Sequence, residues 1–371
     1  MPFLTDRLQE TERADRLARA LADENVTTVP RPTAAAGNSR FTFDLSHIES
    51  ELRGAIVGQD DTIDEILELL TVVRADIGDP RRPLVSVLLA GPTGVGKTET
   101  VRTVARALYG DADAVCRIDM NTLAQEHYAA SFTGAPPGYV GSKEGTTILD
   151  QDKIEGSRAL PGIVLFDELE KASTEVALAL LNVLDNGILT VASGERTYSF
   201  RNALIFMTTN LGARELMALS RPRRLPRLRG GSDSDRARDL VLNRLLARFP
   251  PEFVNRIDHV ATLNPIRPQT MPLLVDVELD RVNRRLRKHN VKIVLEDAVR
   301  AFLSHSGYDS LFGARGLRRA IRRHLEFPLA AYLLSDKGTS RADGAVLRAV
   351  MQGSDIAFVE AEKGTEARDK G

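Results

Sequence analysis

The fold of this chain is decided by one stretch of sequence, LVSVLLAGPTGVGKT (84–98). Its apolar start (84–90) is typical of a strand buried in a parallel sheet, and residues 97–109 follow with the periodicity of a helix. Residues 91–98 fit the pattern Gly-x-x-x-x-Gly-Lys-[Ser/Thr], whose glycines let successive backbone N–H groups turn toward phosphate oxygens. The N-terminus of the helix adds the positive end of its dipole. The stretch therefore predicts a site for the phosphates of a nucleotide.

The residues of this loop have separate expected roles. Lys97 should reach the outer phosphates of a nucleoside triphosphate, and Thr98 should be a ligand of Mg²⁺. The predicted cofactor-binding segment consists of Gly91, Pro92, Thr93, Gly94, Val95, Gly96, Lys97 and Thr98.

Acidic and polar side chains end two further apolar strands. Asp167 and Glu168 close the run GIVLFDE (162–168), and Asn210 closes IFMTTN (205–210). Asp167 can hold Mg²⁺ through water, and Glu168 can polarise the water that attacks the terminal phosphate. Asn210 can orient that water. Two acids after a strand are often only solvated, but together with a phosphate loop upstream they predict hydrolysis of a nucleoside triphosphate.

Strands alternate with helices through the first two thirds of the chain, which predicts an α/β fold with a parallel sheet covered by helices on both faces. The expected strands are 84–90, 114–119, 162–167, 202–209 and 259–263, and the expected helices are 97–109, 174–185 and 236–248. After Pro265 the pattern changes to helices over 268–289, 296–305 and 316–333 with short strands over 291–295, 345–350 and 355–360. We therefore expect an N-terminal helix and linker (1–43), a large ATPase domain (44–264), a small α+β C-terminal domain (265–362) and a tail (363–371).

Composition narrows the functional classes. The 371 residues are 43% hydrophobic and 27% charged with a formal net charge of −1, which is the profile of a globular protein with no global attraction to nucleic acid or anionic lipid. Cys116 is the single cysteine and reads as a small buried apolar side chain, which suits a reducing compartment. The N-terminus lacks the apolar core of a secretory signal, and no stretch approaches the roughly 20 apolar residues of a membrane span. We expect a cytoplasmic protein without membrane contact.

Nine short motifs follow one another along the chain. They are IVGQDD (56–61), GPTGVGKTE (91–99), RIDMN (117–121), GAPPGYVG (134–141), VLFDELEKA (164–172), LLNVLDNGILT (180–190), FRNALIFMTTNLG (200–212), FPPEFVNRID (249–258) and GYDSLFGARGLRRAI (307–321). With these motifs the chain, from about Ile48 to Val359, resembles the AAA+ ATPases of the Clp type, most of all the second ATPase module of ClpB and ClpA.

The resemblance implies ATP and Mg²⁺ as cofactors and further roles for single residues. Ile56 and Val57 would pack against adenine, Arg256 would be the arginine finger that enters a neighbouring copy's site, and Arg315 would be the second sensor. Guanidinium groups suit both places because they present paired donors to phosphate oxygens.

The resemblance also implies a homo-hexameric ring that threads unfolded or misfolded proteins through a central pore. Its pore loop would be Gly138, Tyr139, Val140 and Gly141, in which glycines give backbone freedom and the ring of Tyr139 gives a flat contact that tolerates any sequence. The hairpin read from residues 187–200 is a candidate second pore contact.

Departures from the family leave alternatives. Only about 45 residues precede the motor in this sequence, whereas ClpB and ClpA carry an N-terminal domain and a first ATPase module there. We therefore expect a single-ring or stripped-down machine that selects substrates through residues 1–40, an adaptor or the pore. Peptidase-coupled relatives carry an [aliphatic]-Gly-[Phe/Leu] loop; the corresponding stretch 218–235 lacks it and has five arginines between 221 and 229. An unfoldase coupled to a Clp-type peptidase remains the main alternative. A transcriptional activator of the AAA+ type (FTGA, 132–135) and a nucleotide-switched scaffold are weaker ones.

Overall fold

The computed structural model describes residues 39–124, 148–190, 197–220, 233–309, 313–335 and 345–360. The predicted pore loop and the arginine-rich stretch 221–229 therefore lie outside the described residues.

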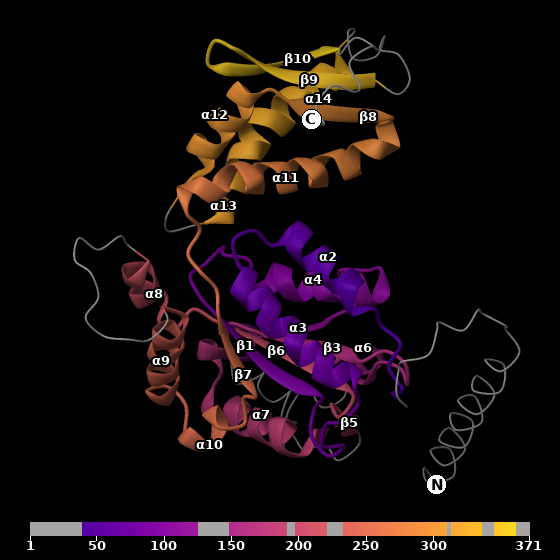
Figure 1. Cartoon of the computed structure of the whole chain (residues 1–371), viewed down its shortest axis with the longest axis vertical. Coiled ribbons are helices and arrows are strands. Elements are labelled where there is room, and N and C mark those ends of the chain that lie inside the picture. Colours follow the sequence, from indigo (N-terminus) through magenta and orange to yellow (C-terminus); the bar gives the residue numbers. More distant parts are fainter. Residues whose placement is uncertain are drawn as a thin grey trace, which may run out of the picture. The chain divides into compact units, whose positions relative to one another are not determined.

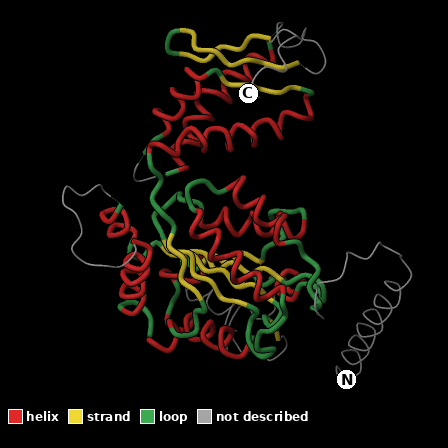
Figure 2. Tube along the Cα trace, viewed as in Figure 1, coloured by secondary structure: helices red, strands yellow, loops and turns green. Residues whose placement is uncertain are grey.

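A five-stranded parallel sheet forms the centre of the larger part of the chain (Figures 1 and 2). In spatial order its strands are β2 (Cys116–Asp119), β3 (Gly162–Asp167), β6 (Ala203–Thr209), β1 (Val85–Ala90) and β7 (His259–Thr262). All residues of β1, β3 and β6 are buried, which explains why these strands read as unbroken apolar runs. The observed strands confirm the predicted parallel α/β sheet.

Helices cover both faces of this sheet, and the alternation of side chains along β1 separates two cores. Val87 and Leu89 pack with α2, α3 and α4, whereas Leu88 and Ala90 pack with the core that contains α7, α8, α9 and α10. The helices are α2 (Leu45–Ala55), α3 (Asp60–Arg74), α4 (Lys97–Tyr109), α7 (Thr174–Asn186), α8 (Ala213–Leu219), α9 (Asp233–Leu246) and α10 (Pro251–Val254). The three-layer arrangement is the one that alternating strands and helices predict.

Shorter elements connect these layers. They are η1 (Thr122–Ala124), α6 (Gln151–Glu155), η2 (Leu169–Lys171), η3 (Pro268–Thr270) and the antiparallel pair β4 (Ile188–Thr190) and β5 (Thr197–Ser199). The pair β4–β5 confirms the hairpin expected over 187–200 at its two described strands. Cys116 is buried, as expected, and burial raises the pKa of its thiol.

The C-terminal part has its own core and a three-stranded sheet in the order β10-β9-β8. Its elements are α11 (Met271–Leu286), η4 (Arg287–His289), β8 (Val291–Leu295), α12 (Asp297–Gly307), α13 (Ala314–Ile321), η5 (Arg322–Glu326), α14 (Phe327–Leu334), β9 (Ala345–Gln352) and β10 (Asp355–Glu360). Strands β8 and β9 are parallel, and β9 and β10 are antiparallel. This is the small α+β domain that the sequence predicts, here called the small domain.

The last predicted helix differs from the observed structure in detail. The single helix expected over 316–333 consists of α13, a π-helical turn over Arg322–Glu326 and α14. Pro328 stands in the first turn of α14 and has no backbone N–H to donate to the preceding turn. A π turn is one of the ways in which a helix accommodates such a loss.

Candidate active site

A cavity of about 280 Å³ opens at the carboxyl ends of the central strands. Its lining includes nine of the residues predicted from sequence, which are Thr93, Gly94, Gly96, Lys97, Thr98, Asp167, Glu168, Asn210 and Arg315. Seven further lining residues were not predicted as site residues, namely Glu99, Arg102, Arg117, Asp119, Thr208, Ala314 and Arg318. Segments more than 200 residues apart in sequence thus meet at one pocket.

The phosphate loop joins β1 to α4 in the strand–loop–helix order that its pattern requires. Gly96 has φ +113°, a conformation that side chains rarely adopt, and it caps the N-terminus of α4. A Cβ added at Gly91 would lie 2.9 Å from the carbonyl oxygen of Leu263, so this glycine also permits close packing against the chain after β7. Gly91 and Gly96 are therefore required by local backbone geometry and packing, in addition to their expected role in phosphate binding.

Lys97 is one of the two buried charged residues of the pocket, together with Asp167. Its ammonium donates hydrogen bonds to the carbonyl oxygens of Gly91 (2.6 Å) and Pro92 (2.9 Å) and to Oδ1 of Asn210 (2.9 Å). These three bonds match the three donors of an ammonium group. Burial lowers the pKa of Lys97 to about 8, and the nearby carboxylates of Glu170 and Asp167 oppose that shift.

Asp167 is held from several directions. Its Oδ2 accepts two hydrogen bonds from Arg117, at 3.1 Å from Nε and 2.6 Å from the terminal nitrogen. Its Oδ1 accepts from the hydroxyl of Thr208 and lies 3.5 Å from the hydroxyl of Thr98. Hydroxyl and carboxylate oxygens are the hard donors that Mg²⁺ takes together with water and phosphate oxygens, so Thr98 and Asp167 fit the metal that the sequence predicts.

The described residues contain no group of three or more His, Cys, Asp or Glu that could enclose a metal.

Glu168 has an unusual backbone. Its φ of +59° places it in the left-handed region, and its N–H donates to the hydroxyl of Thr208 at 3.0 Å. Such conformations are uncommon for residues other than glycine and persist where the surrounding structure enforces them, often at functional sites. The hydroxyl of Thr208 on β6 thus contacts both Asp167, which ends β3, and Glu168, which follows it. These two contacts fix the positions of the two acids relative to each other.

Asn210 links the phosphate loop to a glutamate that sequence reasoning missed. Its Nδ2 donates to Oε1 of Glu170 at 3.1 Å, and its Oδ1 accepts from Lys97. The second carboxylate oxygen of Glu170 accepts from the hydroxyl of Thr209 at 2.8 Å. Glu170 stands two residues after Glu168 in the acidic motif, but its partners are on β6, and only the fold shows that pairing.

The small domain contributes cations and a backbone contact. Arg315 and Arg318 line the pocket from α13, and the N–H of Ala314 donates to the carbonyl of Gly94 in the phosphate loop at 3.0 Å. Arg315 lies close enough to Lys97 for its charge to lower the pKa of that ammonium. The concentration of cations suits a polyphosphate ligand.

Arg256 does not line this pocket. Its side chain is 44% exposed and its Nε lies 3.2 Å from a carboxylate oxygen of Asp185. It precedes β7, and its backbone carbonyl accepts from the hydroxyl of Ser86 at the start of β1. Arg256 is therefore placed at the amino ends of the parallel strands, opposite to the pocket.

Ile56 and Val57, the two residues expected to contact adenine, are not among the residues that line the pocket. Ile56 is buried, with its Cδ1 3.9 Å from the position of a Cβ added at Gly96, and Val57 is half-buried. Their contact with adenine stays a prediction. Gly91, Pro92 and Val95 are also not among the lining residues, although the carbonyl oxygens of Gly91 and Pro92 accept hydrogen bonds from Lys97. The pore residues Gly138, Tyr139, Val140 and Gly141 lie outside the described residues.

Comparison with known proteins identifies the two parts of the chain separately. Residues 82–260 match the family described as AAA domain (Cdc48 subfamily), and residues 267–346 match the C-terminal D2-small domain of ClpB protein. Among the described residues, no helix combines the length and apolar character needed to cross a membrane.

Similar proteins agree with this division. The chain is 55% identical over 344 residues to the ATP-dependent protease ATP-binding subunit-like protein AmiB of Pseudomonas aeruginosa, covering 90% of this chain and 93% of the relative. It is 43% identical over 340 residues to an ATP-dependent protease ATP-binding subunit-like protein of Rhodococcus erythropolis (90% and 92%). It is 41% identical over 312 residues to the chaperone protein ClpB of Rhizobium meliloti, covering 84% of this chain but 34% of ClpB. With these matches over nearly its whole length, the chain belongs to the Clp-type AAA+ ATPases, as an ATPase domain followed by a small domain of the ClpB D2 kind.

Proposed function

We propose that this ATPase is a protein-remodelling motor whose active sites are completed between neighbouring copies in a homo-hexameric ring. The observation that carries the proposal is the placement of Arg256 at the opposite end of the sheet from the pocket. Strand β1 alone has six residues, which is roughly 20 Å of extended chain at about 3.3 Å per residue. An arginine finger at this position can serve only the pocket of another copy.

Within each pocket we assign the chemistry as follows. Lys97 and Arg315 would bind the phosphates of ATP, and Thr98 and Asp167 would hold Mg²⁺, which supplies charge neutralisation at the phosphates when bound. Glu168 accepts a proton from the attacking water, and Asn210 orients that water. The Arg256 of the neighbouring copy stabilises the charge that spreads over the transferred phosphoryl group.

The work done on a substrate is assigned to the loop with Tyr139. A flat aromatic side chain between glycines suits contact with extended polypeptides of any sequence. The ClpB relatives are named chaperones, which supports unfolded or misfolded protein as the substrate class. Nucleic acid and membrane are not proposed as partners.

The experiment that tests this proposal compares Tyr139→Ala with Tyr139→Phe in the full chain. ATP turnover by both variants should stay near wild type, since Tyr139 is not assigned to the pocket. Unfolding or reactivation of a model substrate should be lost in Tyr139→Ala and kept in Tyr139→Phe, which retains the ring. Unchanged remodelling by Tyr139→Ala would contradict the assigned pore contact.

A second candidate function is favoured by the names of two relatives. The proteins of Pseudomonas aeruginosa and Rhodococcus erythropolis are both named as like an ATP-binding subunit of an ATP-dependent protease. This supports an unfoldase that passes its substrate to a Clp-type peptidase, although residues 218–235 lack the docking tripeptide of such unfoldases. Degradation of a labelled substrate by the chain plus a purified Clp peptidase, against chain or peptidase alone, decides between the two.

A further inference from the structure

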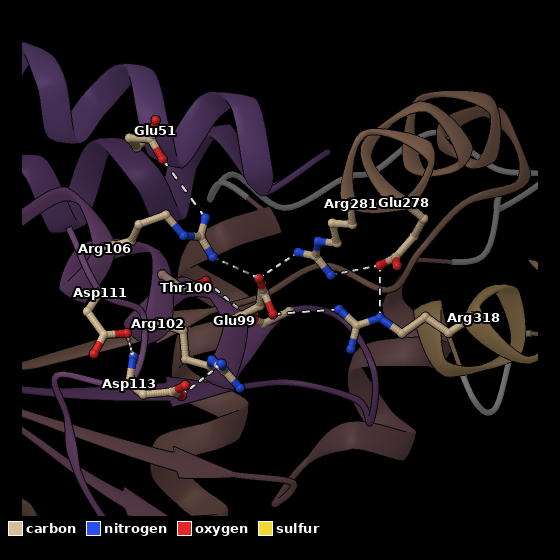
Figure 3. A network of polar contacts seen from close by, with 11 residues as sticks. Glu51, Glu99, Thr100, Arg102, Arg106, Asp111, Asp113, Glu278, Arg281 and Arg318 are labelled. Carbon is tan, nitrogen blue, oxygen red and sulfur yellow. Dashed lines mark hydrogen bonds and ion pairs between the residues drawn. The ribbon is translucent and has the colours of Figure 1, made fainter. Parts of the chain in front are cut away.

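Glu99 is the centre of an ion-pair cluster that joins the first turn of α4 to the small domain (Figure 3). One oxygen of Glu99 lies 2.5 Å from a terminal nitrogen of Arg281 on α11, and the other lies 3.6 Å from Arg318 on α13. Glu278 joins the same two arginines, at 2.8 Å from each. The side chains of Glu99, Arg281 and Glu278 are only 20%, 20% and 14% exposed.

The cluster is balanced in charge. On the large-domain side, Arg106 lies 3.9 Å from Glu99 and 3.9 Å from Glu51. Three arginines (106, 281 and 318) thus share three glutamates (51, 99 and 278) in a partly buried setting. Partly buried charges with several partners are screened less by salt than single surface pairs, and removing one partner leaves the others uncompensated.

The cluster lies next to the phosphate loop because Glu99 is in the first turn of α4. Glu99 follows Lys97 and Thr98 directly, in the first turn of α4, where a carboxylate also interacts favourably with the helix dipole. The small domain therefore contacts the helix that begins with the two residues assigned to phosphate and metal.

A second contact ties the small domain to the phosphate loop itself. The N–H of Ala314 donates to the carbonyl of Gly94, and Gly313 has φ +52° beside it. A Cβ added at Gly313 would lie 2.9 Å from the oxygen of Gly94. The start of α13 is thus packed against the loop, while Arg318, one turn along, reaches Glu99.

We propose that Glu99 is a positioning residue for nucleotide binding. Through Arg281 and Arg318 it holds α11 and α13 against the first turn of α4, and this keeps Arg315 at the phosphate pocket. Arg315 and Arg318 are three residues apart on α13 and so lie on one face of that helix, both lining the pocket. Fixing one of them on Glu99 fixes the direction of the other. The inference rests on the proposed role of Arg315 and does not depend on protein threading.

The test is a double-mutant cycle between Glu99→Gln and Arg315→Ala in the full chain, read out as the affinity for a fluorescent ATP analogue. Each single substitution should weaken binding about tenfold, within the usual range of coupled contacts. Because Glu99 acts through Arg315, the double variant should bind no more weakly than Arg315→Ala alone, to within about twofold. Independent effects that multiply to about a hundredfold loss would overturn the proposal.

Two further variants keep the test decisive. Arg281→Gln removes the shorter of the two ion pairs between Glu99 and the small domain. It replaces Glu99→Gln in the cycle if Glu99→Gln does not fold, and it should also show coupling to Arg315. Asp276→Asn is the matched control, because it removes an ion pair with Arg300 (3.0 Å) that lies within the small domain. It should leave nucleotide affinity unchanged, and a loss equal to that of Glu99→Gln would mean that any damage to the small domain suffices.

Discussion

The amide oxygen of Asn210 accepts a hydrogen bond from the buried ammonium of Lys97 at 2.9 Å, and this bond joins the end of β6 to the phosphate loop. Its direction depends on Glu170, which accepts from the amide nitrogen of Asn210 and thereby turns the oxygen toward the lysine. Asn210 therefore has one defined orientation, and Glu170 enforces it.

Replacing Glu170 by alanine should lower kcat for ATP hydrolysis about tenfold to a hundredfold while changing nucleotide affinity much less. The reason is that Asn210 loses the acceptor that orients its amide, whereas Lys97 keeps two carbonyl acceptors in the loop. Steady-state ATPase kinetics together with equilibrium binding of an ATP analogue separate the two quantities. Glu68→Gln, at an exposed position of α3, is the control and should match wild type. A Glu170→Ala variant with unchanged kcat would contradict the orienting role.

Nucleotide affinity should fall as pH rises above about 8. Lys97 has a pKa of about 8 instead of 10.5 because it is buried, so the nucleotide-free protein loses this charge above pH 8. Since the phosphates need the charged form, each further pH unit should weaken binding by up to about tenfold. Titration of the affinity for an ATP analogue between pH 7 and pH 9.5 would show the bend; constant affinity up to pH 9.5 would indicate an ordinary lysine.

Whereas nucleotide affinity should fall with rising pH, the contribution of Lys97 to folding stability should rise. The unfolded chain keeps the Lys97 proton up to about pH 10.5 while the folded chain loses it near pH 8, so the unfolded state binds more protons between these values. The contribution of Lys97 to the free energy of unfolding therefore rises with pH in that window. Urea unfolding at several pH values would measure this. Between about pH 8 and pH 10.5, the free energy of unfolding should gain a contribution in wild type that is missing in Lys97→Met.

Mixing two inactive variants should restore ATP hydrolysis if Arg256 serves a neighbouring copy. Arg256→Ala keeps an intact pocket but lacks the finger, and Lys97→Met keeps the finger but lacks a working pocket. In rings formed from equal amounts, roughly a quarter of the subunit boundaries combine an intact pocket with an intact finger. Phosphate release by the mixture should approach that fraction of wild type. A mixture as inactive as its components, or an Arg256→Ala protein with normal turnover, would rule out a shared site.

Gly313→Ala should weaken ATP binding more than Gly353→Ala does. Both glycines have positive φ (+52° and +65°), so alanine strains the backbone by about 1–2 kcal/mol at either place. Only at Gly313 would the new Cβ press on the phosphate loop, because nothing lies within 4 Å of the corresponding position at Gly353. Comparing nucleotide affinity and thermal unfolding of the two variants separates contact with the loop from backbone strain. Equal affinities would show that the loop tolerates the displacement.

Much of the fold follows from local sequence because the central strands are buried on both faces. Strands β1, β3 and β6 each begin or end within one residue of the expected bounds, since an unbroken apolar run has clear limits. The short helix α6 and the π turn before α14 were not predicted. The first has only five residues, and the second depends on how a proline fits within a longer helical pattern.

The candidate site was predictable at residues that belong to recognisable motifs, which are the phosphate loop, Asp167 and Glu168, Asn210, and Arg315. The phosphate loop is contiguous, so its residues could be named from spacing alone. Arg117, Glu170 and Glu99 were missed as site residues because their partners are Asp167, Asn210 and Arg281, which other elements bring near. Charged residues of this kind also occur on any solvated surface, and no periodicity distinguishes those that a fold will pair.

One buried strand touches both ends of the proposed catalytic arrangement. At its start, the backbone N–H of Ser86 donates to Asp258 at 2.8 Å and its hydroxyl holds the carbonyl of Arg256; at its end, Ala90 runs into the phosphate loop. A close-packed strand transmits displacement instead of absorbing it. In the proposed ring, we therefore expect phosphate binding in one copy to shift the Arg256 that this copy contributes to the neighbouring site, so that ATP hydrolysis in adjacent copies would be coupled.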